Sequence, residues 1–151
     1  MLRDFEYTDI RPLHHMIQAT IDGSYPAYYP KRAVQFFKEY HSEPNIHKRN
    51  QRGDIIVIEK EGKIVATGSL VQDEITGVFV LPAKQRSGLG KQIMLELESR
   101  AKSKEISMIT LHVSLPARKF YEKLKYTLSD QQATEVGDGQ QLKYWIGKKR
   151  I

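Results

Sequence analysis

Apolar positions along the chain change their spacing several times, and these changes outline the first elements. Residues 2–7 alternate apolar and polar, as in a half-buried strand. Asp9 can cap a helix whose apolar positions recur every three or four residues and which ends near residues 23–26. A second helix is predicted from about Pro30, with apolar residues at three-residue steps, and we expect it to stop before Pro44.

The middle of the chain predicts an antiparallel meander. Residues 54–60 have the β-branched density of a buried strand, and residues 61–63 are typical of a tight hairpin turn. The chain returns as a strand over 64–72, and residues 75–80 make a third member. Because the links are short, neighbouring strands should run in opposite directions.

A crossover is predicted next. From Gly90 an apolar stripe indicates an amphipathic helix ending near Lys104, and residues 106–113 are strand-like. A strand, a helix and a second strand in this order make residues 75–80 and 106–113 parallel partners. The remaining elements are a short helix and two strands, at 116–124, 126–130 and 142–147.

Composition narrows the class of protein. The 151 residues are 40% hydrophobic and 28% charged, which is typical of a globular chain, and we expect one domain over 1–151. No apolar run is long enough to span a membrane, and the start "MLRDFEYTDI" is unlike a signal peptide, so we expect a cytoplasmic protein. With no cysteine, and no histidine pair at ligand spacing, we expect no metal.

The net charge of +6 suggests an anionic partner. The basic residues are scattered, and their one dense cluster, at 148–150, has no interleaved aromatic residues, so we expect no specific nucleic-acid binding. A solvated basic face that aids solubility is the favoured explanation of the charge. A phosphorylated small molecule is the other candidate.

The stretch "VFVLPAKQRSGLGK" at 78–91 predicts an anion site, because a glycine-rich loop opens a helix whose first N–H groups are unpaired. Two phosphate motifs fail here. A P-loop would need a glycine at Gln85 and a serine or threonine at Gln92. The dinucleotide fingerprint would need a glycine at Ile93. Simple helix capping by glycine is the plainer alternative.

The surviving pattern resembles motif A of the GNAT superfamily of N-acetyltransferases, Val-x-Pro-x-x-(Gln/Arg)-x-x-Gly-x-(Gly/Ala). The matching residues are Val80, Pro82, Gln85, Gly88 and Gly90. A second stretch, "SLPARKFYEKLKYT", is similar to motif B of the same family, with matches at Ala117, Phe120, Tyr121, Glu122, Lys123 and Leu124. Ser114 stands in place of the usual asparagine, Lys125 in place of glycine and Tyr126 in place of phenylalanine.

The resemblance implies an α/β (α+β) GNAT fold with about four helices. Its mixed central sheet would have about six or seven strands, with an antiparallel N-terminal meander and a splayed parallel pair at the centre. Acetyl-CoA would be the acyl donor, with its pantetheine arm along Phe79 and Val80 and near Ser114. Its pyrophosphate would meet the loop residues Gln85, Arg86, Ser87, Gly88, Leu89, Gly90 and Lys91.

The resemblance also implies catalytic roles. Tyr121 would be the general acid for the leaving thiolate, although the same residue could be a packed aromatic beside Phe120. Glu74 is a possible base, on the same face as Val80 if the strand has no bulge, but it also fits a solvated turn. His112 could titrate near neutral pH, although a core position is favoured.

Tyr25, Tyr28 and Tyr29, in a loop that contains proline, form either a wall of the acceptor site or a packing loop. The implied function is transfer of acetyl from acetyl-CoA to a primary amine of a small molecule or a protein. A catalytically silent acyl-CoA sensor or scaffold on the same fold is the alternative. Homodimers are frequent in the family, but no sequence feature here establishes one.

Overall fold

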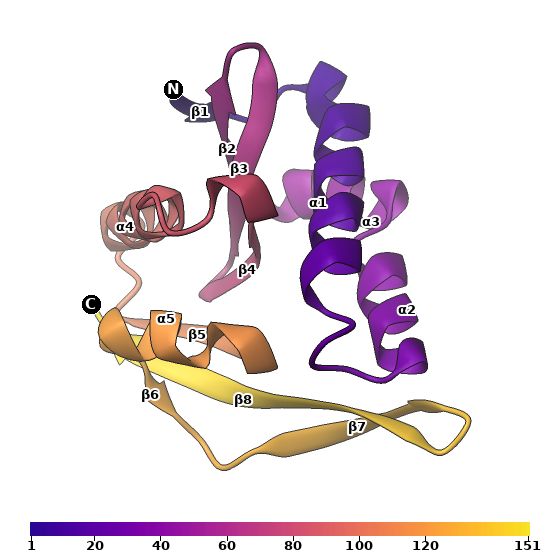
Figure 1. The fold of residues 1–151 in the computed structure, drawn as a ribbon. Helices are drawn as coiled ribbons and strands as arrows, with labels where there is room; N and C mark the ends of the chain where they lie inside the picture. Colours follow the sequence, from indigo (N-terminus) through magenta and orange to yellow (C-terminus); the bar gives the residue numbers. More distant parts are fainter.

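The computed structural model of residues 1–151 is built around a mixed eight-stranded sheet (Figure 1). Its order is β1-β2-β3-β4-β5-β8-β6, with β7 paired to β8. The strands are β1 Leu2–Asp4, β2 Gly53–Lys60, β3 Lys63–Val71, β4 Glu74–Val80, β5 Met108–Ser114, β6 Thr127–Leu128, β7 Gln132–Gly137 and β8 Gln140–Arg150. The helices are α1 Ile10–Ser24, α2 Lys31–Tyr40, α3 Glu43–Arg52, α4 Leu89–Ser103 and α5 Arg118–Lys123.

The predicted meander is confirmed, since β2, β3 and β4 pair one after another in antiparallel orientation, and β1 pairs antiparallel with β2 at the edge of the sheet. Glu61 and Gly62 form the two-residue turn between β2 and β3, with φ of 53° and 75°. Positive φ at both positions gives the type I′ turn that matches the twist of a hairpin. The short turn fixes the register of these two strands.

The predicted parallel pair is also confirmed, and it is splayed. β4 and β5 share one register pair, Glu74 with Thr110, near the start of β4. Beyond it β5 pairs along its whole length with β8, from Met108 to Ser114. The two strands therefore separate toward their carboxyl ends, where β4 continues to Val80.

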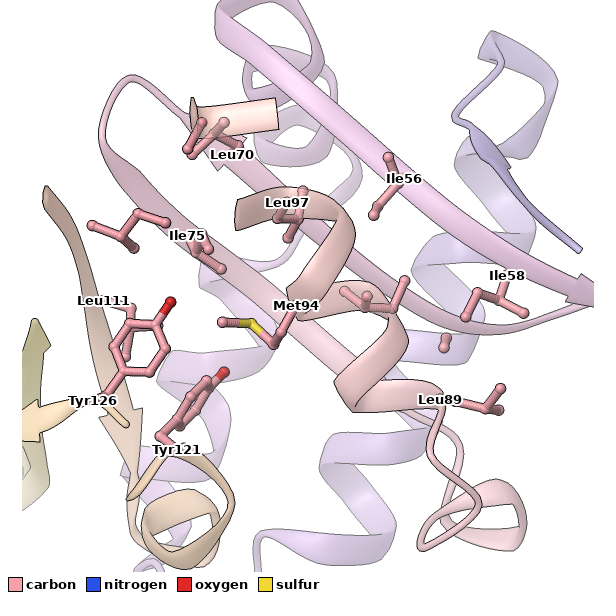
Figure 2. Close-up of a cluster of buried hydrophobic side chains, with 14 of the residues drawn as sticks. Ile56, Ile58, Leu70, Ile75, Leu89, Met94, Leu97, Leu111, Tyr121 and Tyr126 are labelled. Carbon is pink, nitrogen blue, oxygen red and sulfur yellow. The ribbon is translucent and has the colours of Figure 1, made fainter. Parts of the chain in front are cut away.

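Helices cover the two faces of the sheet and enclose two apolar clusters. α4 lies over one face of β2 to β4, and α1, α2 and α3 lie over the other (Figure 1). The first cluster joins Ile56, Ile75 and Leu97 with Tyr121 and Tyr126, as Figure 2 shows. The second is made mainly by α1 and by β2 residues of the opposite face, with Phe79 of β4 among them.

The sheet has eight strands, one or two more than expected, and the five helices are one more than expected. α3 was missed because Pro44 was interpreted as a terminator. It instead lies in the first turn of a new helix, where its missing N–H costs nothing. Ser42 caps that helix by accepting a hydrogen bond of 3.3 Å from the Asn45 N–H. The short strand β7, which forms a hairpin with β8, was also not predicted.

Candidate active site

A cavity of about 250 Å³ lies where β4 and β5 separate. Its walls come from residues of both strands, from α2, from α5 and from the β7–β8 hairpin. Eleven of its eighteen lining residues are hydrophobic, so a polar group inside it is poorly solvated. Five residues predicted from the sequence line it together, namely Tyr25, Glu74, Phe79, Ser114 and Tyr121.

A bulge in β4 decides which side chains face the cavity. Ser69 of β3 pairs with Thr76, whereas Thr67 pairs with Phe79, so β4 carries one extra residue at this point. Gly77 lies in the bulge with φ of 64°. Gly77 and Val78 therefore have no register partner on β3.

Because of the bulge, Glu74 does not lie on the same face of β4 as Val80, contrary to expectation. An unbroken strand would place Glu74 on the same face as Val80. In the structure Val80 packs toward the α4 cluster, whereas Phe79 belongs to the cluster under α1. Glu74 lines the cavity together with Phe79, half-buried and without an ion pair. It is not a fully solvated turn residue.

Tyr121 projects from α5 into the wall between cluster and cavity, beside Tyr126 and Met94 (Figure 2). The residue is 7% exposed, and its ring packs edge-on against Phe120, with centroids 5.0 Å apart. The hydroxyl makes no hydrogen bond within the chain. Burial raises the pKa of this phenol, with a further contribution from Tyr25. The group therefore stays protonated and is free to donate.

Tyr25 and Ser114 meet at the cavity wall. Burial raises the pKa of Tyr25 to about 12, and the adjacent Ser114 hydroxyl opposes part of this rise. Tyr25 also packs edge-on against Phe37, with ring centroids 4.8 Å apart. Its position is thus fixed from both sides.

The other two tyrosines of the predicted acceptor wall do not line the cavity. Tyr28 is exposed, at 53%. Tyr29 is buried, and its hydroxyl donates to the Lys143 carbonyl at 3.1 Å and accepts from the Leu115 N–H at 2.8 Å. Tyr29 therefore ties the link between α1 and α2 to β8 and to the end of β5, and only Tyr25 remains as a wall residue.

His112 is on the surface of β5 and not in the core, contrary to the favoured expectation. Its ring lies 5.0 Å from that of Tyr144, and both residues line the cavity. This face of β5 is left open because the strand separates from β4 there.

The glycine loop between β4 and α4 is exposed from Gln85 to Gly88. Gly88 caps α4 with φ of 85°, and no atom lies within 4 Å of the place a Cβ would take. Open space and a left-handed backbone give a ligand close access to the first N–H groups of the helix. The exposed side chains of Arg86 and Lys91 flank this point.

Some loop side chains have structural roles. Gln85 donates from Nε2 to the Val80 carbonyl at 2.9 Å, which braces the loop against the end of β4. The Ser87 hydroxyl donates to the Lys84 carbonyl. Leu89 is buried in the first cluster, so only its main chain faces outward. A Cβ on Gly90 would lie 3.1 Å from the Phe120 ring, so this glycine lets α5 pack on α4.

The turn after α5 keeps its shape despite Lys125. Lys125 has φ of 74°, the Tyr126 N–H donates to the Tyr121 carbonyl at 3.1 Å, and the Lys125 N–H donates to Glu122 at 3.0 Å. These two bonds form a Schellman motif, in which glycine is usual. The departure from the family pattern therefore costs conformational strain and leaves the turn intact.

Sequence reasoning missed a buried pair at the far end of the cavity. His41 follows α2 and lines the cavity, and Arg49 of α3 lies behind it. The two residues are 5% and 8% exposed, and Nη2 of Arg49 is 3.0 Å from Nδ1 of His41. The pair was hidden because α3 itself was not predicted.

The structure contains no cluster of three or more His, Asp or Glu side chains suited to a metal ion. No helix is long and apolar enough to cross a membrane.

A sheet with a splayed parallel pair and a glycine-rich helix start defines a class of acyltransferase folds, and comparison identifies the family. The model of the acetyltransferase (GNAT) domain matches residues 25–139. The chain belongs to this family. A comparison with curated protein sequences gave no significant match.

Solved structures agree over the full length of the chain. A GCN5-related N-acetyltransferase from Rhodopseudomonas palustris superposes with a TM-score of 0.90 at 19% identity, covering 100% of this chain and 95% of that one. The PaiA N-acetyltransferase of Thermoplasma acidophilum, solved with coenzyme A, gives 0.81 at 16%, covering 100% and 98%. YncA of Salmonella typhimurium, solved with acetyl-CoA, gives 0.73 at 15%, covering 99% and 92%. At such identities the likeness establishes a shared fold.

Proposed function

We propose that this protein is an acetyl-CoA-dependent N-acetyltransferase that acts on a primary amine. The observation that carries the proposal is the Tyr121 hydroxyl, which is protonated and has no partner in the chain, at the wall of a cavity between the separated ends of β4 and β5. The hydroxyl is not sealed from solvent, so a ligand that fills the cavity can accept the hydrogen bond that no group of the chain takes.

Acetyl-CoA fits the arrangement from the loop to the cavity. The main-chain N–H groups at the start of α4 would hold the pyrophosphate, with Arg86 and Lys91 as charge partners. The pantetheine arm would lie along the free edge of β4 near Phe79 and Val80, much as an added strand does. Ser114 on the facing edge of β5 is placed to contact the same arm.

In the reaction the amine nitrogen first forms a bond to the acetyl carbon, and the carbon–sulfur bond breaks when the resulting intermediate collapses. Tyr121 would give a proton to the leaving sulfur. A main-chain N–H at the β4 bulge would stabilise the negative oxygen of the intermediate. Glu74 would take the proton of the amine, directly or through water, since it is the one carboxylate that lines the cavity.

A panel of amines tests the proposal. The protein is mixed with acetyl-CoA and each amine, and release of CoA is followed with a thiol reagent, which works cleanly because the chain has no cysteine. Amine-dependent CoA release supports the proposal. If acetyl-CoA binds and raises the melting temperature but no amine is acetylated, the protein is an acyl-CoA sensor or scaffold on this fold.

A further inference from the structure

Arg49 is buried without a carboxylate partner. The residue is 8% exposed and takes part in none of the ion pairs of the chain, although most other buried or half-buried charges do. Burial lowers the pKa of Arg49, and Tyr40 and Glu74 oppose part of this shift. An unpaired buried cation is costly, so its retention points to a function.

The one side-chain partner of Arg49 is His41, and this contact fixes the proton of the imidazole. A guanidinium carries only donors, so Nη2 must donate to Nδ1 of His41 across the 3.0 Å between them. In the neutral ring the remaining proton is then on Nε2. Burial and the adjacent cation hold the pKa of His41 well below its usual value, so the ring stays neutral.

The β4 bulge makes room for this pair. A Cβ on Gly77 would lie 2.6 Å from Nη1 of Arg49 and 3.8 Å from Cε1 of His41. The glycine thus lets the guanidinium lie against the strand at the bulge. Since the thioester would react beside this bulge, His41 is close to the reacting amine.

The free nitrogen of His41 opens into the cavity. Nε2 of His41 has no partner within the chain. It is nevertheless not sealed from solvent, because the only side-chain polar atom that is both sealed and unpartnered is Nε of Arg32. His41 lines the cavity, and its ring is held edge-on between Phe79 and Tyr40, with centroids 4.9 and 5.0 Å away. The ring therefore presents a fixed N–H donor to whatever fills this space.

We propose that His41 is a specificity-determining residue that donates from Nε2 to an oxygen of the acceptor, and that Arg49 is the residue that positions it. The inference rests on the proposed function, since it concerns the acceptor of that reaction. It assigns the acceptor to amines that carry a carboxylate or carbonyl oxygen next to the amino group, as α-amino acids and their amides do. The positive charge of Arg49 behind the donor favours such an oxygen.

The mouth of the cavity indicates the rest of the acceptor. Phe36 and Tyr40 of α2 stack at 6.2 Å and are 40% and 47% exposed while lining the cavity, and Phe37 lies beside them. Glu74 is the one acidic side chain in the lining, which suits one amino group and not a polyamine. An apolar or aromatic side chain on the acceptor fits this surface.

Three acceptors that differ only next to the amine test the inference: L-phenylalanine, L-phenylalaninamide and 2-phenylethylamine. For the wild type we expect kcat/KM for one or both of the first two to exceed that for 2-phenylethylamine by at least about tenfold, the effect of one charge-assisted hydrogen bond. In His41→Phe this ratio should fall by about tenfold or more, because kcat/KM for the first two acceptors drops. A wild type without this preference, or a preference that survives the substitution, overturns the inference.

Controls separate the role of His41 from damage to the fold. His47→Phe makes the same change at a histidine that packs against Tyr7, outside the cavity, and should keep the wild-type ratio. Nitrogen NMR of the imidazole of His41 should show the proton on Nε2, and Arg49→Met should abolish this fixed preference. A wild-type spectrum with the proton on Nδ1 contradicts the inference even if the variants do not fold.

Failure of the proposed function gives a different result. If no amine is acetylated, the binding of L-phenylalaninamide to the CoA-loaded protein is measured by calorimetry. Binding that is lost in His41→Phe and kept in His47→Phe supports the recognition role without the chemistry. Absence of binding, or equal binding by all three proteins, overturns it.

Discussion

Replacing Tyr121 with phenylalanine should separate catalysis from stability. The hydroxyl makes no hydrogen bond within the chain, and the ring is held by packing against Phe120 and Tyr126. Phenylalanine keeps that packing, so the free energy of unfolding should change by less than about 1 kcal/mol. Loss of a general acid should lower kcat by about 10²–10⁴-fold, or about 2.7–5.4 kcal/mol of activation free energy.

Tyr126→Phe is the matched control, because it removes the neighbouring hydroxyl from the same cluster. That hydroxyl donates to the buried carboxylate of Glu98 at 2.7 Å and does not line the cavity. Its loss should lower the free energy of unfolding by about 1.5–3 kcal/mol, since a charged acceptor loses a donor. Acetyl transfer below the melting temperature should be unchanged.

Urea unfolding and initial rates at saturating acetyl-CoA measure both variants, with calorimetry for acetyl-CoA affinity. We expect opposite results for the two variants. Tyr121→Phe should keep its free energy of unfolding and lose kcat, whereas Tyr126→Phe should lose free energy of unfolding and keep kcat. A Tyr121→Phe protein with nearly full kcat refutes the assignment of the general acid. Equal loss of rate in both variants would instead mean that the shared packing controls the rate.

Three further predictions concern other positions. Lys125→Gly should raise the free energy of unfolding by about 0.5–1 kcal/mol, because relief of left-handed strain exceeds the added entropy of the unfolded chain. A lower free energy of unfolding, measured with urea, would contradict this. Gly88→Glu should abolish acetyl-CoA binding by calorimetry while circular dichroism shows a folded protein; unchanged affinity would place the pyrophosphate elsewhere. His41, whose pKa burial holds well below 6.5, takes up a proton below that pH only when unfolded, so stability should fall as pH drops below 6.5 and be flat above it. His41→Phe should remove this component of the acid destabilisation, as urea midpoints at neutral and acidic pH would show.

Much of the fold could be predicted because short links and regular spacing leave few choices. Glu61 and Gly62 specify a tight turn, and the crossover into residues 106–113 specifies parallel strands. Pro44 could not be assigned by spacing alone, since proline is equally at home just after one helix and in the first turn of the next. That ambiguity concealed α3 and with it Arg49.

The candidate site was less predictable, because the side of the sheet on which a strand side chain lies depends on single-residue irregularities such as bulges. Gly77 in a strand pattern did not reveal a bulge, and the bulge reverses the parity between Glu74 and Val80. Three nearby tyrosines also looked alike in sequence. The hydroxyl of Tyr29 found two main-chain partners and was removed from the cavity wall, whereas Tyr25 remained there.

The separation of β4 from β5 after Glu74 and Thr110 leaves two strand edges whose amide groups face a gap. Recognition by such edges depends on the course of the main chain, and most side chains along them are free to vary. A fold built in this way tolerates extensive sequence drift without losing its cleft. Structures that superpose with TM-scores of 0.73 to 0.90 at only 15 to 19% identity are what that tolerance leads one to expect.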